Sequence, residues 1–208
     1  MNIPFVDLKT QYQSIKSEID STIQNVIDDT SFIGGNYVKK FENEYTNAYE
    51  VKHCISCANG TDAIYITLKA LGIGPGDEVI TVVNTWISTS ETITQAGAKP
   101  VFIDISPEYY TIDVKQIEEK ITEKTKAIIP VHLFGQPAEM DKIVEICKRY
   151  NLHLIEDCAQ AHFAEWKDKK VGTMGIAGTF SFFPGKNLGA YGDAGAIISN
   201  NEEFSKKA

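Results

Sequence analysis

The sequence predicts an α/β fold: a three-layer α/β/α sandwich with a mostly parallel seven-stranded sheet, preceded by an N-terminal helical arm. Three observations lead to this prediction. Short apolar runs alternate with helix-like segments, which is the pattern of βαβ units. The runs are almost continuously apolar, as in strands that are buried on both faces. The 208 residues, 43% hydrophobic and 23% charged, suffice for one well-buried core.

The N-terminal segment is expected to form an arm and a helix. Between residues 10 and 29, apolar side chains recur three and four positions apart, which marks one face of an amphipathic helix. The stretch before it contains Pro4 and is typical of an extended arm. A second helical pattern covers Asn36–Tyr49. We therefore expect residues 1–35 to form an arm and helix, and residues 36–208 to form one larger domain.

Within the larger domain, strands and helices follow one another in order. The predicted strands are short, mostly β-branched and mostly bounded by turn residues. They cover His53–Ser56, Glu78–Val83, Val101–Ile103, Ala127–Val131, Leu152–Ile155, Gly178–Phe182 and Gly195–Ser199. Helical patterns cover Thr61–Leu71, Ser88–Ala96, Asp113–Lys124 and Ala138–Tyr150. Asp113 is the expected N-cap of the third pattern, and residues 202–208 look like the start of another helix.

Charge and composition exclude several classes of function. The formal net charge of −8 repels phosphate backbones, and no basic run is longer than a pair of residues, so we expect no nucleic-acid partner. The N-terminus has no basic region followed by an apolar stretch, as a signal peptide would. No segment approaches the roughly 20 apolar residues that cross a bilayer. These features favour a cytoplasmic enzyme without a membrane partner.

Three local motifs suggest other chemistry, but none is complete. Cys54 and Cys57 form a C-x-x-C, which is compatible with redox chemistry or half a metal site. A second ligand pair is missing, so we favour small hydrophobic side chains in a buried strand and expect no metal. Around Gly185-Lys186, the P-loop pattern lacks both its first glycine and its hydroxyl residue. The glycines at 72–76 precede a strand and are better interpreted as a turn.

In open parallel sheets, ligands bind outside the carboxyl ends of the strands, so the residues that follow each strand are the candidates. After the first strand, Gly60 permits close backbone approach, and Thr61 with the exposed amides of a helix start suits a phosphate dianion. A simple capping turn is the alternative. After the second strand, Trp86 offers an aromatic face for a planar ring or a side chain for the core.

After the fifth strand, Asp157 is a carboxylate at a buried strand end and needs a partner. A protonated pyridine nitrogen would serve, and so would a protein arginine or backbone amides. Gln160 is placed to donate to a phenolate oxygen, and for His162 we favour packing over substrate contact. After the sixth strand, Lys186 stands among aromatic residues, Pro and Gly, where desolvation would free its amine as a nucleophile. Ser181 offers a second hydroxyl to a phosphate. A surface lysine in a turn is the alternative for Lys186.

Taken together, these residues resemble the DegT/StrS family of sugar aminotransferases, in the fold-type-I (aspartate aminotransferase-like) superfamily that uses pyridoxal 5'-phosphate (PLP). The similarity runs from Pro4 to the last residue and would make this chain the PLP-binding large domain. Its marks are Ala58-Asn59-Gly60-Thr61-Asp62, Gly74-Pro75-Gly76-Asp77-Glu78-Val79, Thr85-Trp86-Ile87-Ser88-Thr89, Pro130-Val131-His132-Leu133-Phe134-Gly135, Glu156-Asp157-Cys158-Ala159-Gln160 and Ser181-Phe182-Phe183-Pro184-Gly185-Lys186-Asn187-Leu188-Gly189.

The resemblance implies two catalytic residues. Lys186 would hold the cofactor as a Schiff base and later move a proton between the substrate carbon and the cofactor. Asp157 would keep the pyridine nitrogen of PLP protonated, which makes the ring an electron sink.

The resemblance also implies how the cofactor is bound. Trp86 would stack on the ring, and Gln160 would bond its phenolic oxygen. Thr61 and Ser181 would hold the phosphate, with backbone from Gly60.

For the whole enzyme, the resemblance implies an amino-acid donor, usually glutamate, and a nucleotide-linked keto sugar, dTDP- or UDP-linked, as acceptor. Overall likeness favours a 3-keto over a 4-keto sugar, in amino-sugar and polysaccharide (O-antigen) biosynthesis. The family implies a homodimer with shared active sites and a C-terminal small domain, which we expect to be missing from these 208 residues. Two alternatives stay open: a PLP-dependent sugar dehydratase, which has histidine where Lys186 stands, and a catalytically inactive regulatory or binding relative.

Overall fold

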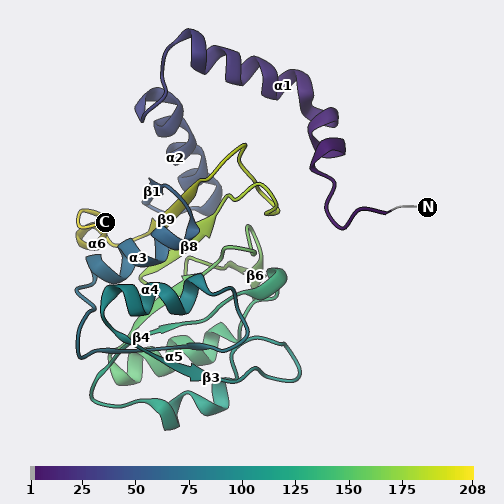
Figure 1. Cartoon of the computed structure of the whole chain (residues 1–208). Helices are drawn as coiled ribbons and strands as arrows, with labels where there is room; N and C mark the ends of the chain where they lie inside the picture. Colours follow the sequence, from purple (N-terminus) through teal and green to yellow (C-terminus); the bar gives the residue numbers. More distant parts are fainter. Residues whose placement is uncertain (1–2) are drawn as a thin grey trace.

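Seven strands build the main sheet of the computed structural model, which describes residues 3–208. They are β1 (His53–Cys57), β2 (Glu78–Val82), β3 (Lys99–Ile103), β4 (Thr125–Ile129), β5 (His153–Asp157), β8 (Ala177–Ser181) and β9 (Gly195–Ser199). Their spatial order is β1-β9-β8-β5-β4-β2-β3 (Figure 1). Strand β9 runs antiparallel to both of its neighbours, and every other pair is parallel. The predicted seven-stranded, mostly parallel sheet is therefore confirmed.

Six α-helices accompany the sheet. They are α1 (Leu8–Asp28), α2 (Gly35–Tyr49), α3 (Gly60–Ala70), α4 (Ser88–Ala96), α5 (Met140–Tyr150) and α6 (Glu202–Ser205) among residues 3–208. The predicted boundaries of α1 to α5 are correct to within two residues. The helix expected near the end of the sequence forms as α6.

The helices cover both faces of the sheet because successive strand residues point to opposite sides. On β2, Ile80 belongs to the core cluster that includes Met140 and Ile143 of α5, whereas Val79 belongs to the cluster with Ile93 of α4. Helices α2 and α5 lie on the first face, and α3, α4 and α6 lie on the second. This confirms the three-layer sandwich (Figure 1).

Helix α1 stands apart from these layers. It buries none of its residues and extends away from the sheet in Figure 1. Asp7 caps its first turn by accepting a hydrogen bond from the amide of Thr10, and the ring of Tyr12 meets Tyr191 at a centroid distance of 6.0 Å. The predicted amphipathic helix is thus present. Residues 1 and 2 of the expected arm lie outside the described residues, and the domain boundary at residue 35 stays a prediction.

The helix predicted over Asp113–Lys124 is wrong. The segment forms two short 3₁₀ turns, η1 (Val114–Gln116) and η2 (Glu118–Lys120). Asp113 caps the first turn as expected, by accepting from the amide of Lys115. The chain then turns at Ile121 into an extended conformation and enters β4. The apolar residues of this segment do reach the core, so the periodicity indicated the buried face correctly but not the type of helix.

The structure contains a two-stranded hairpin that the sequence did not predict. It pairs β6 (Glu165–Trp166) with β7 (Lys169–Lys170) through a turn at Lys167 and Asp168. Both turn residues have positive φ, of 49° and 63°. Such turns favour Asn and Gly, and a Lys-Asp pair gives little signal in the sequence.

The two cysteines of the C-x-x-C segment point to opposite faces of β1. Cys54 packs against the cluster under α2, and Cys57 packs against the cluster that contains Phe204 of α6. Because they lie three positions apart in a strand, the two sulfur atoms do not face a common ligand. All four cysteines are free thiols. Their contacts agree with the interpretation of small hydrophobic side chains.

Among residues 3–208, no helix is both long enough and apolar enough to span a bilayer.

The backbone of β8 packs closely against the preceding loop, where Gly178 meets Gly172. A Cβ atom at Gly178 would lie 2.5 Å from Cα and 2.6 Å from O of Gly172. Because backbone atoms cannot yield cheaply, we expect Gly178→Ala to lower the free energy of unfolding by about 1–3 kcal/mol. Gly192 has open space around its Cβ position, so Gly192→Ala should stay within about 0.5 kcal/mol. Urea unfolding of both variants checks this, and equal stability of the two would contradict the assigned contact.

Candidate active site

The loops that carry the predicted site residues meet at one edge of the sheet. Strands β1, β2, β5 and β8 point in the same direction, so their carboxyl ends share an edge. Ligands of open α/β sheets bind at this edge. Alternation along the strands directs Asp157 and Ser181 to the face that α3 and α4 cover. Leu154, three positions before Asp157, and Phe180, directly before Ser181, belong to clusters on the other face.

The first turn of α3 leaves two backbone donors without a protein partner. Asn59 satisfies two of the four amides at this helix start: its side chain accepts from Asp62, and its carbonyl accepts from Ala63. The amides of Gly60 and Thr61 have no acceptor among residues 3–208. Unpaired amides at a helix N-terminus attract anions. This turn is therefore a fitting cradle for a phosphate group.

Three hydroxyl groups surround these amides. The hydroxyl oxygens of Thr61 and Ser88 are 2.7 Å apart, which brings the N-termini of α3 and α4 together. Ser181 lies so close to the helix start that a Cβ on Gly60 would meet its Cβ at 2.5 Å. Glycine at position 60 is thus required by close approach, as predicted. Ser88 was not assigned a role from the sequence, although it belongs to one of the quoted motifs.

Asp157 is a buried carboxylate with two protein donors. Only 5% of its surface is exposed. Its Oδ2 accepts from the hydroxyl of Thr89 at 2.8 Å, and its Oδ1 accepts from the amide of Ala159 at 3.1 Å. No arginine pairs with it within the described part of the chain. Burial raises its pKa, and the two hydrogen bonds oppose that rise. Each oxygen keeps acceptor capacity for one more donor.

Lys186 follows β8, the strand that pairs with β5. It lies in a turn, where its amide donates to the carbonyl of Phe183, and its side chain is half-buried. Burial lowers the pKa of its amine, and the negative charge of Asp157 opposes that shift. The same charge interaction helps to lower the pKa of Asp157. A lysine with a lowered pKa more often carries the neutral amine, which is the nucleophilic form.

Gln160 is held in one orientation by a strained backbone. Its Oε1 accepts from the amide of Phe134 at 2.8 Å. Phe134 has a positive φ of 54°, which few non-glycine residues adopt. Because the carbonyl end is engaged by the backbone, the NH₂ end of Gln160 is left as the donor for a ligand. Such strain is common at functional sites.

Trp86 and His162 differ in exposure. Trp86 is 72% exposed, so the core alternative for this tryptophan is wrong. His162 is buried, and its ring bonds the hydroxyl of Tyr45 at 2.8 Å and the carbonyl of Ser181 at 3.0 Å. It lies between aromatic rings, which agrees with the packing role that the sequence favoured.

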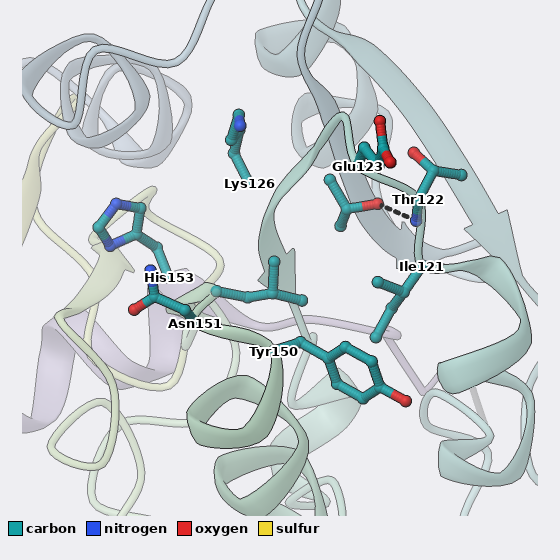
Figure 2. Close-up of a pocket in the computed structure, with 9 residues that line it drawn as sticks. Ile121, Thr122, Glu123, Lys126, Tyr150, Asn151 and His153 are labelled. Atoms are coloured by element: carbon teal, nitrogen blue, oxygen red, sulfur yellow. Dashed lines mark hydrogen bonds between the residues drawn. The ribbon is translucent and has the colours of Figure 1, made fainter.

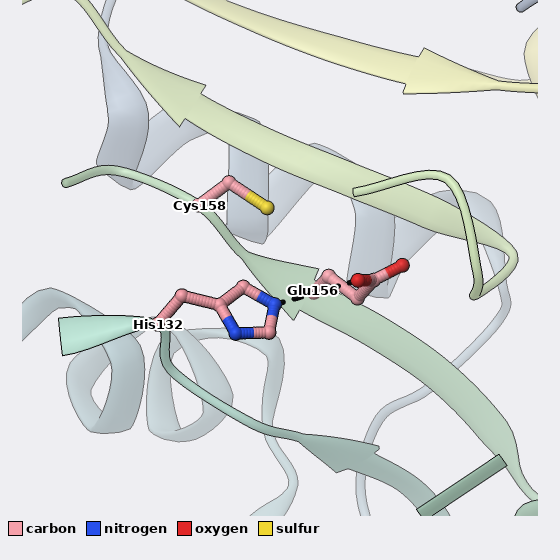
Figure 3. Close-up of side chains that lie close together, drawn as sticks. All are labelled: His132, Glu156 and Cys158. Carbon is pink, nitrogen blue, oxygen red and sulfur yellow. Dashed lines mark hydrogen bonds and ion pairs between the residues drawn. The ribbon is translucent and has the colours of Figure 1, made fainter. Parts of the chain in front are cut away.

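A second buried cluster of ligand-type atoms has a structural explanation. His132, Glu156 and Cys158 bring one such atom each within 4.8 Å of one another (Figure 3). Ala138 donates to Nδ1 of His132, which assigns the proton to Nε2, and Nε2 faces Glu156 Oε2 at 3.4 Å.

The other acceptor positions of the Glu156 carboxylate are also occupied. They receive the backbone amides of Gly172, Met174 and Gly175 at 2.7–2.8 Å. Burial raises the pKa of the Cys158 thiol, which disfavours the thiolate that metals bind. We therefore interpret the cluster as a hydrogen-bond network that ties the 172–175 loop to β5.

A hollow of about 510 Å³ lies at the opposite edge of the sheet. Lys126, Tyr150, Asn151 and His153 are among the residues that line it (Figure 2). It opens at the amino ends of β4 and β5. None of the predicted site residues line it.

Known proteins that are similar to this chain include members of one family of aminotransferases. The family model described as "DegT/DnrJ/EryC1/StrS aminotransferase family" matches residues 13–208. A "Pleiotropic regulatory protein" of Geobacillus stearothermophilus is 53% identical over 207 residues, which is 100% of this chain and 56% of that protein. The "UDP-2-acetamido-2-deoxy-3-oxo-D-glucuronate aminotransferase" of Pseudomonas aeruginosa is 47% identical over 203 residues, 98% of this chain and 56% of that protein.

The fold is that of a solved structure with a cofactor. NtdA of Bacillus subtilis "with bound cofactor pmp" superposes with a TM-score of 0.93 at 37% identity, covering 99% of this chain and 47% of that one. The chain therefore spans about half the length of the proteins that it matches.

The buried charge of Asp157 gives a testable pH dependence of stability. Because its folded pKa is raised above the ordinary value of 3.8, the folded state binds more protons than the unfolded state between the two pKa values. Stability therefore falls as pH rises through that window. We expect Asp157→Asn to be more stable than the wild type at pH 7, by about 1.4 kcal/mol for each unit between the two pKa values, and the gain to vanish below pH 3.8.

Asp141 is a matched control, because its partner Lys167 lowers its pKa and the sign reverses. Asp141→Asn should give no gain at pH 7. Denaturant unfolding of both variants at several pH values measures the effect. Equal pH profiles for Asp157→Asn and the wild type would show that position 157 does not bury a charge.

Proposed function

Because the chain belongs to the DegT/DnrJ/EryC1/StrS aminotransferase family, we propose that it is the cofactor-binding part of a PLP-dependent aminotransferase. The enzyme would move an amino group from an amino acid, with glutamate as the expected donor, to a nucleotide-linked keto sugar. One arrangement supports the proposal: Asp157 and Lys186 follow the adjacent parallel strands β5 and β8, beside a helix start with two amides that have no acceptor among residues 3–208. Burial lowers the pKa of the Lys186 amine there and raises that of the Asp157 carboxyl. Proteins of this family depend on PLP.

The residues present fit the cofactor group by group. The two unpaired amides of the α3 start, with the hydroxyls of Thr61, Ser88 and Ser181, suit the phosphate dianion. The free acceptor capacity of Asp157 suits a protonated ring nitrogen, and the NH₂ of Gln160 suits the phenolic oxygen. Exposed Trp86 supplies an aromatic face.

When bound, PLP supplies an electron sink for the carbon that loses or gains a proton. The chain supplies the rest. The Lys186 amine would hold the cofactor through its aldehyde and, when free, would accept and return the proton that moves during the reaction. Asp157, in its charged form, would keep the ring nitrogen protonated, which would strengthen the sink. Its burial makes this charge interaction stronger than it would be in water.

The substrate, the assembly and the biosynthetic role of the enzyme are part of the same proposal. A 3-keto sugar carried on UDP or dTDP is favoured, and the printed name of the Pseudomonas aeruginosa relative describes a UDP-linked 3-oxo sugar. We further propose a cytoplasmic homodimer with shared active sites and a role in amino-sugar or polysaccharide biosynthesis.

A regulatory relative without catalysis is the second candidate. It is favoured by the name of the relative from Geobacillus stearothermophilus, a pleiotropic regulatory protein with 53% identity. The intact group of Lys186, Asp157 and Gln160 argues against a pure binding role, because binding alone does not need a desolvated amine. The dehydratase alternative is disfavoured because position 186 is lysine and not histidine.

The covalent link is the first test. The purified protein, incubated with PLP and reduced with borohydride, should carry a pyridoxyl group on Lys186 in peptide mass spectrometry. Lys186→Ala should lose the yellow colour and the adduct, because it removes the amine. Lys126→Ala, at the opposite edge of the sheet, should keep both. Modification of another lysine with Lys186 untouched would sink the proposed site.

The substrate assignment needs a separate measurement. A panel of dTDP- and UDP-linked 3-keto and 4-keto sugars, with glutamate as donor, should give amino-sugar product from a 3-keto member with the full-length protein. Lys186→Ala should give less than about one thousandth of that product, as expected when a nucleophile is removed. Cofactor capture on Lys186 without any product across the panel would favour the regulatory candidate.

A further inference from the structure

The turn between β2 and α4 carries the exposed Trp86 and also contacts the buried carboxylate of Asp157. Thr89, in the first turn of α4, is only 1% exposed, and its hydroxyl donates to Asp157 Oδ2 at 2.8 Å. The hydroxyl oxygen of Thr85, four residues earlier, lies 3.2 Å from that of Thr89. Trp86 stands between the two threonines in the sequence. The same turn therefore presents an aromatic ring outward and a hydroxyl inward.

The direction of these hydrogen bonds follows from proton counting. A threonine hydroxyl has one hydrogen, and an ionised carboxylate has none. Thr89 donates its only hydroxyl hydrogen to Asp157, so Thr85 must be the donor in the bond between the two threonines. The result is a directed chain from Thr85 to Thr89 to Asp157. Successive hydrogen bonds of this kind polarise one another and strengthen the last one.

Asp157 depends on this chain because few groups stabilise its charge. Besides Thr89, its direct donor is the amide of Ala159. The charged or titratable groups that interact with it from other elements are His132 and Lys186, and Cys158 follows it in the chain. Without the threonine hydroxyl, the buried carboxylate would retain one direct donor within residues 3–208. Loss of a partner to a buried charge is a large effect.

Thr89 also differs from other threonines of the same helix. Thr92, equally buried, bonds the main-chain carbonyls of Ser88 and Thr89. Thr94 bonds the carbonyl of Ser90. Such back-bonding satisfies a hydroxyl inside its own helix. The hydroxyl of Thr89 instead leaves α4 for a side chain at the end of β5.

We propose that Thr89, oriented by Thr85, is a positioning residue that holds the Asp157 carboxylate in place and in its charged form for the cofactor. The part that concerns the cofactor rests on the proposed function. The hydrogen-bond chain itself is a property of this protein with or without PLP, which allows the two to be tested separately.

The test compares Thr89→Val, which removes the hydroxyl at constant volume, with Thr89→Ser, which keeps it. The readout is the titration midpoint of the Asp157 carboxyl carbon in carbon-13 NMR spectra of the protein without cofactor. We expect Thr89→Val to move the midpoint to higher pH and Thr89→Ser to restore the wild-type value. Thr92→Val, a matched loss of a buried hydroxyl on the same helix, should leave it unchanged. An unchanged midpoint in Thr89→Val, or the same shift in Thr92→Val, would overturn the proposal.

Thr85→Val provides a second route if Thr89→Val does not fold. Thr85 is half-buried, and its loss removes only the first member of the chain. The midpoint of Asp157 should move in the same direction by a smaller amount. An unchanged midpoint in this variant would overturn the orienting role of Thr85.

Binding of PLP separates this inference from the function on which it rests. Thr89→Val should weaken PLP binding about tenfold, the effect of one hydrogen bond to a charged group, and Thr89→Ser should not. A shifted midpoint in a protein that never captures PLP would leave the hydrogen-bond chain standing and refute the function. Normal PLP capture on Lys186 with an unshifted Asp157 midpoint in Thr89→Val would support the function and refute the role of the hydrogen-bond chain.

Discussion

The burial of one negative charge, that of Asp157, organises the site. A carboxylate removed from water is unfavourable unless donors or cations surround it. Here a helix supplies the hydroxyl of Thr89, the following turn supplies the amide of Ala159, and the loop after β8 brings the amine of Lys186. None of these groups neutralises the charge fully, since its pKa remains raised. A cationic ring nitrogen would complete the set, so the unfavourable burial would itself favour binding of such a group.

The end of β5 shows how strand geometry divides two neighbouring carboxylates between two tasks. Glu156 points to the face of His132, where four donors occupy its oxygens and fix the 172–175 loop. Asp157 points to the face of α4, where acceptor capacity remains. Alternation by one residue thus separates a carboxylate that holds the fold from one that is available to a ligand.

Close backbone approach is the second constraint on the site. Gly60 allows Ser181 to reach the start of α3, and a Cβ on Gly195 would lie 2.2 Å from the carbonyl oxygen of Asn59. Strands β8 and β9 therefore lie directly against the helix start, where the amides of Gly60 and Thr61 have no partner in the described part of the chain. The sheet thus forms a wall of the proposed phosphate cradle, and donors that are held in place bind an anion with little loss of conformational entropy.

The sequence by itself determined the seven strands, the five main helices and the edge of the sheet at which the candidate site residues Asp157, Gln160 and Lys186 lie. Those features follow from local periodicity and strand order. Tertiary structure alone decided that residues 113–124 form 3₁₀ turns and not an α-helix. It also decided that Ser88 meets Thr61, and that Thr89 and not an arginine supports Asp157. Both are contacts between different elements, and a hydroxyl in a helix-forming segment carries no signal of the partner that folding brings to it.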